Sequence, residues 1–249
     1  MRRDLIGTSL VIEQKTPQAF NLDTILLSWF ARIPPKARHV LDIGTGNGAV
    51  MLYLSTKTKA RITGIEIQDH LVEEARTNIA LNGLENRLSV IRGDARTVDL
   101  PRVSVALSNP PFFRVVAEDR LSRDPARMIA RHEVTLTLED VIRAAARALG
   151  DGGIFYMIHR PDRMEETLRL LALHGFSAKR LMTVHPYRNH KANHVLYRAD
   201  KGGKEGLIID APLVLYKDKG VPSDDMITIY GGTDHASDTA LTERETEIS

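Results

Sequence analysis

The sequence of 249 residues contains no cysteine. This absence excludes any mechanism that needs a cysteine nucleophile, such as methylation of pyrimidine C5. It also excludes every zinc or iron–sulfur site that is held by cysteine. A chain without cysteine agrees with a reducing compartment, and we expect no metal site.

Long apolar runs are also missing from the sequence. The sequence has no run of about 18 apolar residues, the length that a membrane-spanning helix needs. The start Met1-Arg2-Arg3-Asp4 leads into residues of mixed polarity and not into a secretory leader. We therefore expect a cytoplasmic protein without a membrane partner. The length suits one large domain over residues 1–232, with an N-terminal lid and helix in 1–36 and a disordered acidic tail in 233–249.

Segments of strand and helix periodicity alternate along most of the chain, which predicts a doubly wound α/β fold. Parallel strands are expected at 40–43, 62–66, 88–92, 103–107 and 154–158, and an antiparallel C-terminal hairpin near 180–185 and 193–198. Helices are expected at 23–33, 49–56, 68–82, 137–149 and 161–174. Residues 207–216 resemble a further strand or strand pair, broken at Pro212.

A glycine-rich turn, Gly44-Thr-Gly46-Asn-Gly48, joins the first of these strands to a helix. Glycine allows a sharp turn and the close approach of a ligand, and the N–H groups of the following helix point toward the turn. The spacing differs from the Gly-x-Gly-x-x-Gly of dinucleotide sites, and the Lys-Ser/Thr of a phosphate loop is absent. A dinucleotide oxidoreductase is therefore the weakest candidate.

Carboxylates lie at the ends of the first three strands. Asp42 ends the first strand, and Glu66 ends the second, 22 positions after Gly44, where it could accept hydrogen bonds from both ribose hydroxyls. The third strand is followed by Gly93-Asp94-Ala95. The alternative for each acid is a solvated loop residue or a helix cap.

The fourth strand is followed by Asn109-Pro110-Pro111-Phe112. An amine conjugated to a ring or carbonyl is a poor nucleophile, so an enzyme that alkylates it must hold its N–H groups with acceptors. Asn109 offers a side-chain carbonyl and Pro110 a backbone carbonyl, while Phe112 or Phe113 offers a face for stacking. An ordinary proline-stiffened loop is the alternative.

The order of these motifs along the chain resembles that of the class I S-adenosylmethionine-dependent methyltransferases that act on amino groups: a glycine loop, two strand-end acids and then Asn-Pro-Pro-Phe. The resemblance covers residues 38–160 and implies a Rossmann-like fold with a seven-stranded, mostly parallel sheet. It implies that the glycines surround the methionine moiety of S-adenosylmethionine, that Glu66 binds its ribose and that Asp94 binds its adenine amine. The implied cofactor residues are Asp42, Gly44, Gly46, Gly48, Glu66, Ile67, Asp94, Ala95 and Asn109, and the implied catalytic residues are Asn109, Pro110, Pro111 and Phe112.

Three further segments narrow the resemblance. Residues 14–23 resemble a lid in which an aromatic and an acid precede the first helix. Together with Ser108–Phe113 and Ala130–Glu133, they are similar to the bacterial tRNA1(Val) (adenine-37-N6)-methyltransferases. The resemblance implies N6-methylation of adenine 37 in tRNA(Val), with the anticodon stem-loop as partner.

The charges agree with a nucleic-acid substrate. The whole chain carries only +2, but seven cations oppose one acid in residues 179–204, whereas residues 205–249 carry ten acids against three cations. The basic stretch predicts phosphate binding, or else a solvated face around the last hairpin. The arginine-rich segment 114–131 predicts a loop that contacts substrate, or else a solvated linker. The substrate candidates are Phe113, Arg114, Arg188 and Lys191.

Several questions stay open at this point. The same chemistry would serve an rRNA base, a DNA adenine or a protein glutamine amide. A non-catalytic RNA-binding protein on the same fold is a second class of function. His132 and Glu133 either touch substrate or form a local ion pair, and the chain could be a monomer or a homodimer.

Overall fold

A computed structural model describes residues 2–14, 22–110 and 136–231. Most of the expected lid, the segment from Pro111 to residue 135 and the C-terminal tail from residue 232 lie outside the described residues. The predictions made for Pro111, Phe112, Phe113, Arg114, the arginine-rich segment, His132 and Glu133 therefore also lie outside them.

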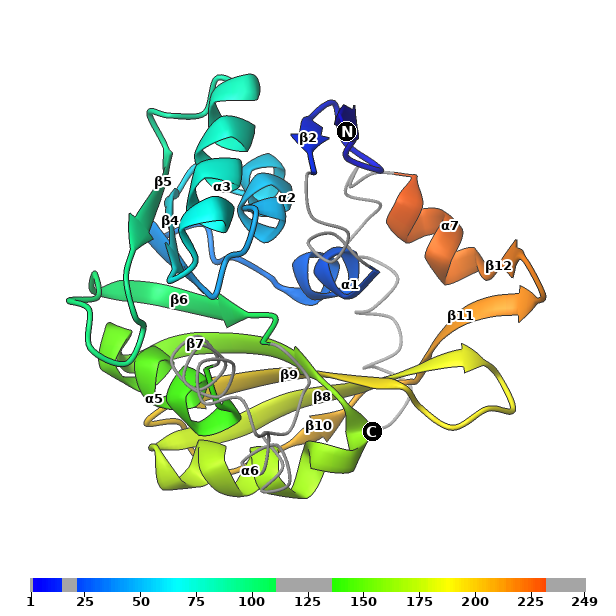
Figure 1. Ribbon diagram of the computed structural model, residues 1–249. Helices are drawn as coiled ribbons and strands as arrows, with labels where there is room; N and C mark the ends of the chain where they lie inside the picture. The colour runs from blue at the N-terminus through cyan, green and yellow to red at the C-terminus, as the bar shows by residue number, and fades with distance from the viewer. Residues whose placement is uncertain (1, 15–21, 111–135, 232–249) are drawn as a thin grey trace, which may run out of the picture.

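A ten-stranded sheet forms the centre of the described structure (Figure 1). Its strand order is β12-β11-β8-β9-β7-β6-β3-β4-β5, and β10 pairs with β8. Strands β5, β4, β3, β6 and β7 run parallel, whereas β9 is antiparallel to both β7 and β8. The seven expected strands are β3 (His39–Ile43), β4 (Arg61–Glu66), β5 (Leu88–Arg92), β6 (Val103–Ser108), β7 (Leu149–His159), β8 (Phe176–Tyr187) and β9 (His194–Lys201). These seven confirm the doubly wound prediction.

Three short strands extend the sheet beyond β8. Strands β10 (Ile208–Ile209) and β11 (Leu213–Asp218) both pair with β8 in parallel, and β12 (Val221–Pro222) pairs with β11. The further strand or strand pair expected in residues 207–216 is thus present as two strands, and Pro212 lies between them.

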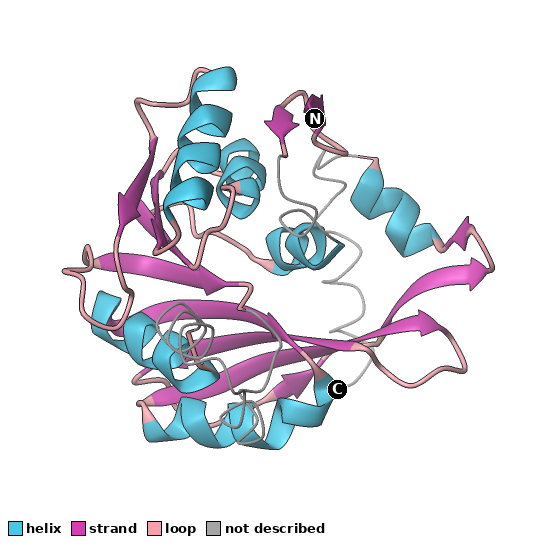
Figure 2. Cartoon of the chain, in the orientation of Figure 1, coloured by secondary structure: helices cyan, strands magenta, loops and turns pink. Residues whose placement is uncertain are grey.

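Helices cover both faces of the sheet (Figure 2). One face carries α1 (Leu22–Phe30), α2 (Ala49–Lys57), α3 (Asp69–Leu81) and α7 (Asp224–Tyr230). The other carries α5 (Leu138–Ala148) and α6 (Met164–Leu173), the latter preceded by the short helix η2 (Pro161–Arg163). Successive side chains of a strand point to opposite faces. Accordingly, Val105 and Leu107 of β6 pack in the first core and Ala106 in the second.

An N-terminal hairpin lies against α3 and was not predicted from the sequence. Its strands are β1 (Arg2–Asp4) and β2 (Val11–Glu13), which pair with each other antiparallel. The hairpin forms a separate two-stranded sheet. It brings the N-terminal segment to the same side of the central sheet as α2 and α3 (Figure 1).

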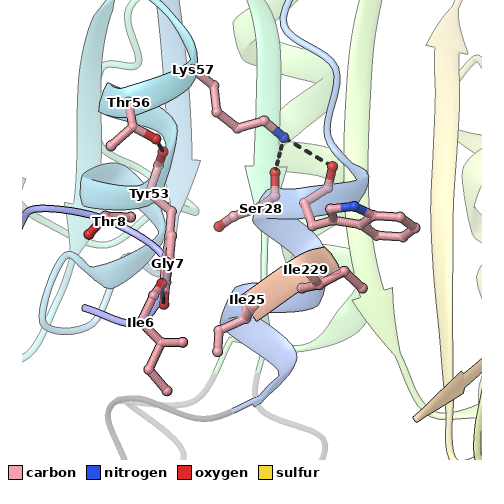
Figure 3. Close-up of a pocket in the computed structure, with 10 residues that line it drawn as sticks. Ile6, Gly7, Thr8, Ile25, Ser28, Tyr53, Thr56, Lys57 and Ile229 are labelled. Atoms are coloured by element: carbon pink, nitrogen blue, oxygen red, sulfur yellow. Dashed lines mark hydrogen bonds between the residues drawn. The ribbon is translucent and has the colours of Figure 1, made fainter. Parts of the chain in front are cut away.

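A small cavity lies where the hairpin loop meets α1, α2 and α7 (Figure 3). Lys57, at the end of α2, donates hydrogen bonds to the carbonyls of Ser28, Trp29 and Ala31, which closes the end of α1. Tyr53 donates to the carbonyl of Ile6 at 3.1 Å. The cavity measures about 20 Å³, room for about one water molecule. It is a packing gap between these elements and is too small for a nucleoside.

Candidate functional site

The carboxyl ends of β5, β4, β3 and β6 lie side by side, and hydrogen bonds join them. Gly93 N–H, after β5, donates to the carbonyl of Glu66 at the end of β4 at 2.9 Å. The Ser108 hydroxyl, at the end of β6, donates to the carbonyl of Ile43 at the end of β3 at 2.8 Å. The four motifs that the sequence placed at strand ends therefore share one rim of the sheet, which is where open α/β sheets bind ligands.

The glycine loop takes a conformation that only glycine adopts easily. Gly44, Gly46 and Gly48 have φ angles of 72°, 57° and 85°, a region that is costly for residues with a Cβ. The N–H groups of Gly44 and Thr45 both donate to the carbonyl of Ile65, at 2.9 and 3.0 Å. The backbone of the loop is thus pinned to the neighbouring strand β4.

Glu66 holds the loop as well as the rim. One carboxylate oxygen accepts the N–H of Gly46 at 3.0 Å, and the other accepts the N–H groups of Ile67 and Gln68 at 2.9 and 3.0 Å. A carboxylate offers about four acceptor positions, so three backbone donors leave capacity for a ligand hydroxyl. The side chain fixes the loop while keeping an acceptor at the rim.

Asp42 lies beneath the loop and is 1% exposed. The hydroxyl of Thr45 donates to its Oδ2 at 2.6 Å. Burial raises the pKa of Asp42 to about 7, the hydrogen bond from Thr45 opposes this rise, and the charge of Glu66 adds to it. The geometry gives Asp42 a direct role in shaping the loop.

Asp94 has a partner that the sequence analysis missed. Both of its carboxylate oxygens accept hydrogen bonds from the guanidinium of Arg96, which also lowers the pKa of Asp94. Arg147 of α5 donates to the carbonyls of Ala95, Arg96 and Val98 and so holds the turn after β5 in place. The carboxylate is kept ionised and oriented at the rim.

Asn109 and Pro110 follow β6 directly, and both are described. Leu107 pairs with Asp42 across the β6–β3 ladder, so Asn109 lies two residues beyond the level of Asp42 on the neighbouring strand. Asn109 is half-buried and Pro110 is buried. The first half of the Asn-Pro-Pro-Phe motif is thus beside the glycine loop.

The residues at this rim fit the cofactor that the resemblance implies. Glu66 and Asp94 are acceptors of the kind that ribose hydroxyls and an adenine amine need. In addition, Asn47 of the glycine loop is fully buried, and among the described residues neither its side-chain N–H₂ nor its side-chain carbonyl has a hydrogen-bond partner. Leaving buried polar groups unpaired is costly, so the loop carries unused donor and acceptor capacity. In the sequence, Asn47 is indistinguishable from an ordinary turn residue, and only the structure shows that its polar side chain is buried and unpaired among the described residues.

The hairpin between β8 and β9 ends at the same rim. Residues 159 and 195 pair across β7 and β9, so the turn that carries Arg188 and Lys191 lies near the carboxyl end of β7. Both side chains are exposed. Within this turn region, Nε2 of His194 lies 3.0 Å from a carboxylate oxygen of Asp23 in the first turn of α1.

Most of the other cations of the basic stretch are engaged elsewhere. Arg180 pairs with Asp210 and Arg198 with Asp200, while Lys201 donates to carbonyls at the end of α5 and the start of β7. Lys179 donates to the carbonyls of residues 204 and 205. The charge count of the stretch therefore overstates the charge available to phosphate at the rim.

Among residues 2–14, 22–110 and 136–231, no helix is long and apolar enough to span a membrane. Over the same ranges, no three histidine, aspartate or glutamate side chains gather as metal ligands would.

A protein-family model described as a methyltransferase domain matches residues 40–153. This range begins in β3 and ends in β7, so it contains the whole rim from the glycine loop to Asn109.

Curated relatives match a larger part of the chain. A tRNA1(Val) (adenine(37)-N6)-methyltransferase of Aeromonas hydrophila is 32% identical over 182 residues, which is 72% of this chain and 75% of that protein. A protein of the same name from Porphyromonas gingivalis is 32% identical over 184 residues, 70% of this chain and 71% of its own length.

Solved structures agree on the fold. A predicted O-methyltransferase from Agrobacterium tumefaciens superimposes with a TM-score of 0.68 over 85% of this chain and 96% of that chain, at 22% identity. A putative RNA methyltransferase from Pyrococcus horikoshii gives a TM-score of 0.54 over 72% and 83% of the two chains, at 18% identity. These likenesses confirm the class I methyltransferase fold.

Proposed function

From the premise that the chain belongs to the tRNA1(Val) (adenine(37)-N6)-methyltransferase family, we propose that the rim binds S-adenosylmethionine and methylates adenine 37 of tRNA. Membership rests on relatives that are 32% identical over more than two thirds of their length. The observation that carries the site assignment is the hydrogen bonding that joins the glycine loop, Glu66 and the ends of β5 and β6 at one rim. The proposal includes a cytoplasmic location, where tRNA is found.

Each residue of the rim has a part in the proposed binding of the cofactor. Gly44, Gly46 and Gly48 allow the methionine moiety to approach the backbone closely. Glu66 with Ile67 receives the ribose hydroxyls, and Asp94 with Ala95 receives the adenine amine. Asp42 supports the loop from below through Thr45.

The proposed transfer needs positioning more than acid–base chemistry. S-adenosylmethionine supplies a methyl carbon that its sulfonium makes electrophilic. Asn109 and Pro110 accept hydrogen bonds from the two N–H groups of the adenine amine and direct its nitrogen at that carbon. The nitrogen held by Asn109 and Pro110 would take the methyl group, with the electron pair of the carbon–sulfur bond left on sulfur, and an amine proton would leave to water, so no strong base is required.

Several further residues of the proposed site, from Pro111 to Arg114, lie outside the described residues. Pro111 and Phe112 complete the motif in sequence, and we assign to Phe112 and Phe113 the stacking on the target base. Arg114, Arg188 and Lys191 are assigned to the phosphates of the RNA, of which the latter two are exposed at the tip of the β8–β9 hairpin.

The proposal is tested with purified protein, labelled S-adenosylmethionine and tRNA(Val) transcripts that carry adenine or guanine at position 37. We expect N6-methyladenosine in the first transcript and none in the second. Label in glutamine of a protein extract, and none in RNA, would instead favour the amide-methylating alternative.

Asn109→Ala tests the amine grip. Because Asn109 is proposed to act on the target amine, kcat should fall by roughly 100- to 1,000-fold, while the Kd for S-adenosylmethionine stays within about threefold. Asn86→Ala, an exposed asparagine before β5, is the matched control and should keep full activity. A parallel loss of turnover and cofactor affinity in Asn109→Ala would remove the residue from its proposed role.

A further inference from the structure

Two asparagine side chains, Asn78 of α3 and Asn82 at its C-cap, take the place of a neighbouring strand for β2. The Oδ1 of Asn78 accepts the N–H of Glu13 at 2.6 Å, and its Nδ2 donates to the carbonyl of Glu13 at 3.0 Å. Asn82 makes the same pair of hydrogen bonds with Val11, at 2.9 and 2.8 Å. Both edges of β2 are therefore paired, one with β1 and one with α3.

The match follows from the repeat distances of helix and strand. Residues four apart on a helix are separated by about 6 Å along its axis, and residues two apart on a strand by about 6.8 Å. A side-chain amide has the same donor and acceptor as a peptide group. Asn78 and Asn82 thus present two peptide-like groups in register with residues 11 and 13.

Asn78 makes a third contact, which Asn82 does not share. Its Nδ2 also donates to the backbone carbonyl of Asn47 in the glycine loop, at 3.0 Å. The other bond of the Asn82 amide goes to the carbonyl of Asn78 within the same helix, at 2.7 Å. Asn78 is fully buried, so water does not compete for these bonds. One side chain therefore joins the N-terminal hairpin to the cofactor loop.

We propose that Asn78 is a positioning residue for the cofactor, which couples the docking of β2 to the conformation of the glycine loop. The inference rests on the proposed function, since it takes the glycine loop as the S-adenosylmethionine site. The bond to the carbonyl of Asn47 fixes the peptide group between Asn47 and Gly48. Coupling between two sites is reciprocal, so the cofactor at the loop stabilises the docked β2, and docked β2 strengthens cofactor binding.

The two asparagines give a matched pair of variants. Asn78→Ala removes the bonds to Glu13 and to the loop, whereas Asn82→Ala removes only the equivalent bonds to Val11 and one bond inside α3. Both variants should speed hydrogen exchange at β2. Asn78→Ala should weaken the binding of S-adenosylmethionine by about five- to tenfold, the usual value of one buried hydrogen bond, whereas Asn82→Ala, which loosens β2 but keeps the bond to the glycine loop, should weaken it by less. Its kcat at saturating cofactor should stay within about threefold, because Asn78 does not touch the reacting atoms.

The experiment combines calorimetry with hydrogen exchange. The Kd for S-adenosylmethionine is measured for the unchanged protein and both variants, and exchange at the amides of residues 11 and 13 is measured in the unchanged protein with and without S-adenosylhomocysteine. Slower exchange with ligand supports the coupling without any variant, so a poorly folding Asn78→Ala leaves the test intact. Equal affinity losses in the two variants, or no slowing of exchange at β2 by S-adenosylhomocysteine, would overturn this inference but leave the proposed function standing. Failure of the unchanged protein to bind S-adenosylmethionine would overturn the proposed function as well.

Discussion

Gly64 in the middle of β4 allows the glycine loop to lie directly on the sheet. A Cβ at this position would lie 2.6 Å from Cγ2 of Thr45, 2.8 Å from its Cβ and 2.9 Å from the sulfur of Met51. Carbon atoms in good contact are about 3.5–4.0 Å apart. Alanine at position 64 would therefore push Thr45 away by up to about 1 Å, and Thr45 carries the hydrogen bond to Asp42.

The cost of this clash can be separated from the general effect of replacing glycine. Overpacking of a filled site costs about 1–3 kcal/mol, whereas alanine in a strand gains about 0.5–1 kcal/mol over glycine when no clash occurs. Gly150 in β7 is the control, because a Cβ there would meet nothing within 4 Å. We expect Gly64→Ala to be less stable than Gly150→Ala by about 1–3 kcal/mol.

Thermal unfolding measures the difference directly. For a chain of this size, about 1 kcal/mol changes Tm by roughly 2–4 °C, so Gly64→Ala should melt several degrees below Gly150→Ala. Its Kd for S-adenosylmethionine should also rise, and Thr45→Ser should relieve part of both effects by removing Cγ2. A Gly64→Ala protein as stable as Gly150→Ala would refute the close packing of the loop on β4.

Three further predictions concern the charged groups of the rim. Glu66→Gln places an N–H₂ group against backbone N–H donors, so the Kd for S-adenosylmethionine should rise about tenfold or more, measured by calorimetry with Glu73→Gln as control. Because burial raises the folded pKa of Asp42 from 3.8 to about 7, its contribution to stability is full below the unfolded value and is lost as pH rises through 7. In urea unfolding between pH 5 and 8, the free energy of unfolding of the unchanged protein should fall relative to that of Asp42→Asn. If the two free energies changed with pH in parallel, the raised pKa of Asp42 would be contradicted. The double variant Arg188→Ala, Lys191→Ala should lower the slope of log affinity for tRNA against log salt by about 1–2, while Lys204→Ala leaves it unchanged.

The parallel part of the fold could be predicted because its signals are local. Buried parallel strands read as short apolar runs, and the turns that follow them carry glycine, acid or proline. Once the strands were taken as parallel, the order of Gly44, Glu66, Asp94 and Asn109 along the chain predicted that these residues lie side by side at one rim of the sheet. The sheet confirms that arrangement.

The N-terminal hairpin could not be predicted in this way. Its strands have three residues each, and β1 is exposed throughout. The groups that hold β2 are side chains 65 and 71 positions further along the chain. No pattern within the segment itself announces such partners.

The basic stretch shows a different limit of sequence analysis. A count of charges treats neighbours in sequence as neighbours in space. The tip and the base of a hairpin, however, lie at opposite ends of its strands. Arg188 and Lys191 lie at the tip, whereas Lys179 and Lys201 lie near the base with backbone carbonyls as partners. Of these four residues, only Arg188 and Lys191 lie on the side of the sheet where β7 has its carboxyl end.

The distance in sequence between β2 and α3 has a consequence for the order of folding. During synthesis, residues 11 and 13 emerge long before Asn78 and Asn82, so β2 has no partner on that edge until α3 has formed. Closing so long a loop is slow compared with local pairing. We therefore expect the hairpin to attach late, after the helix and the strands beside it, so that a nascent chain becomes competent for its cofactor only near the end of folding.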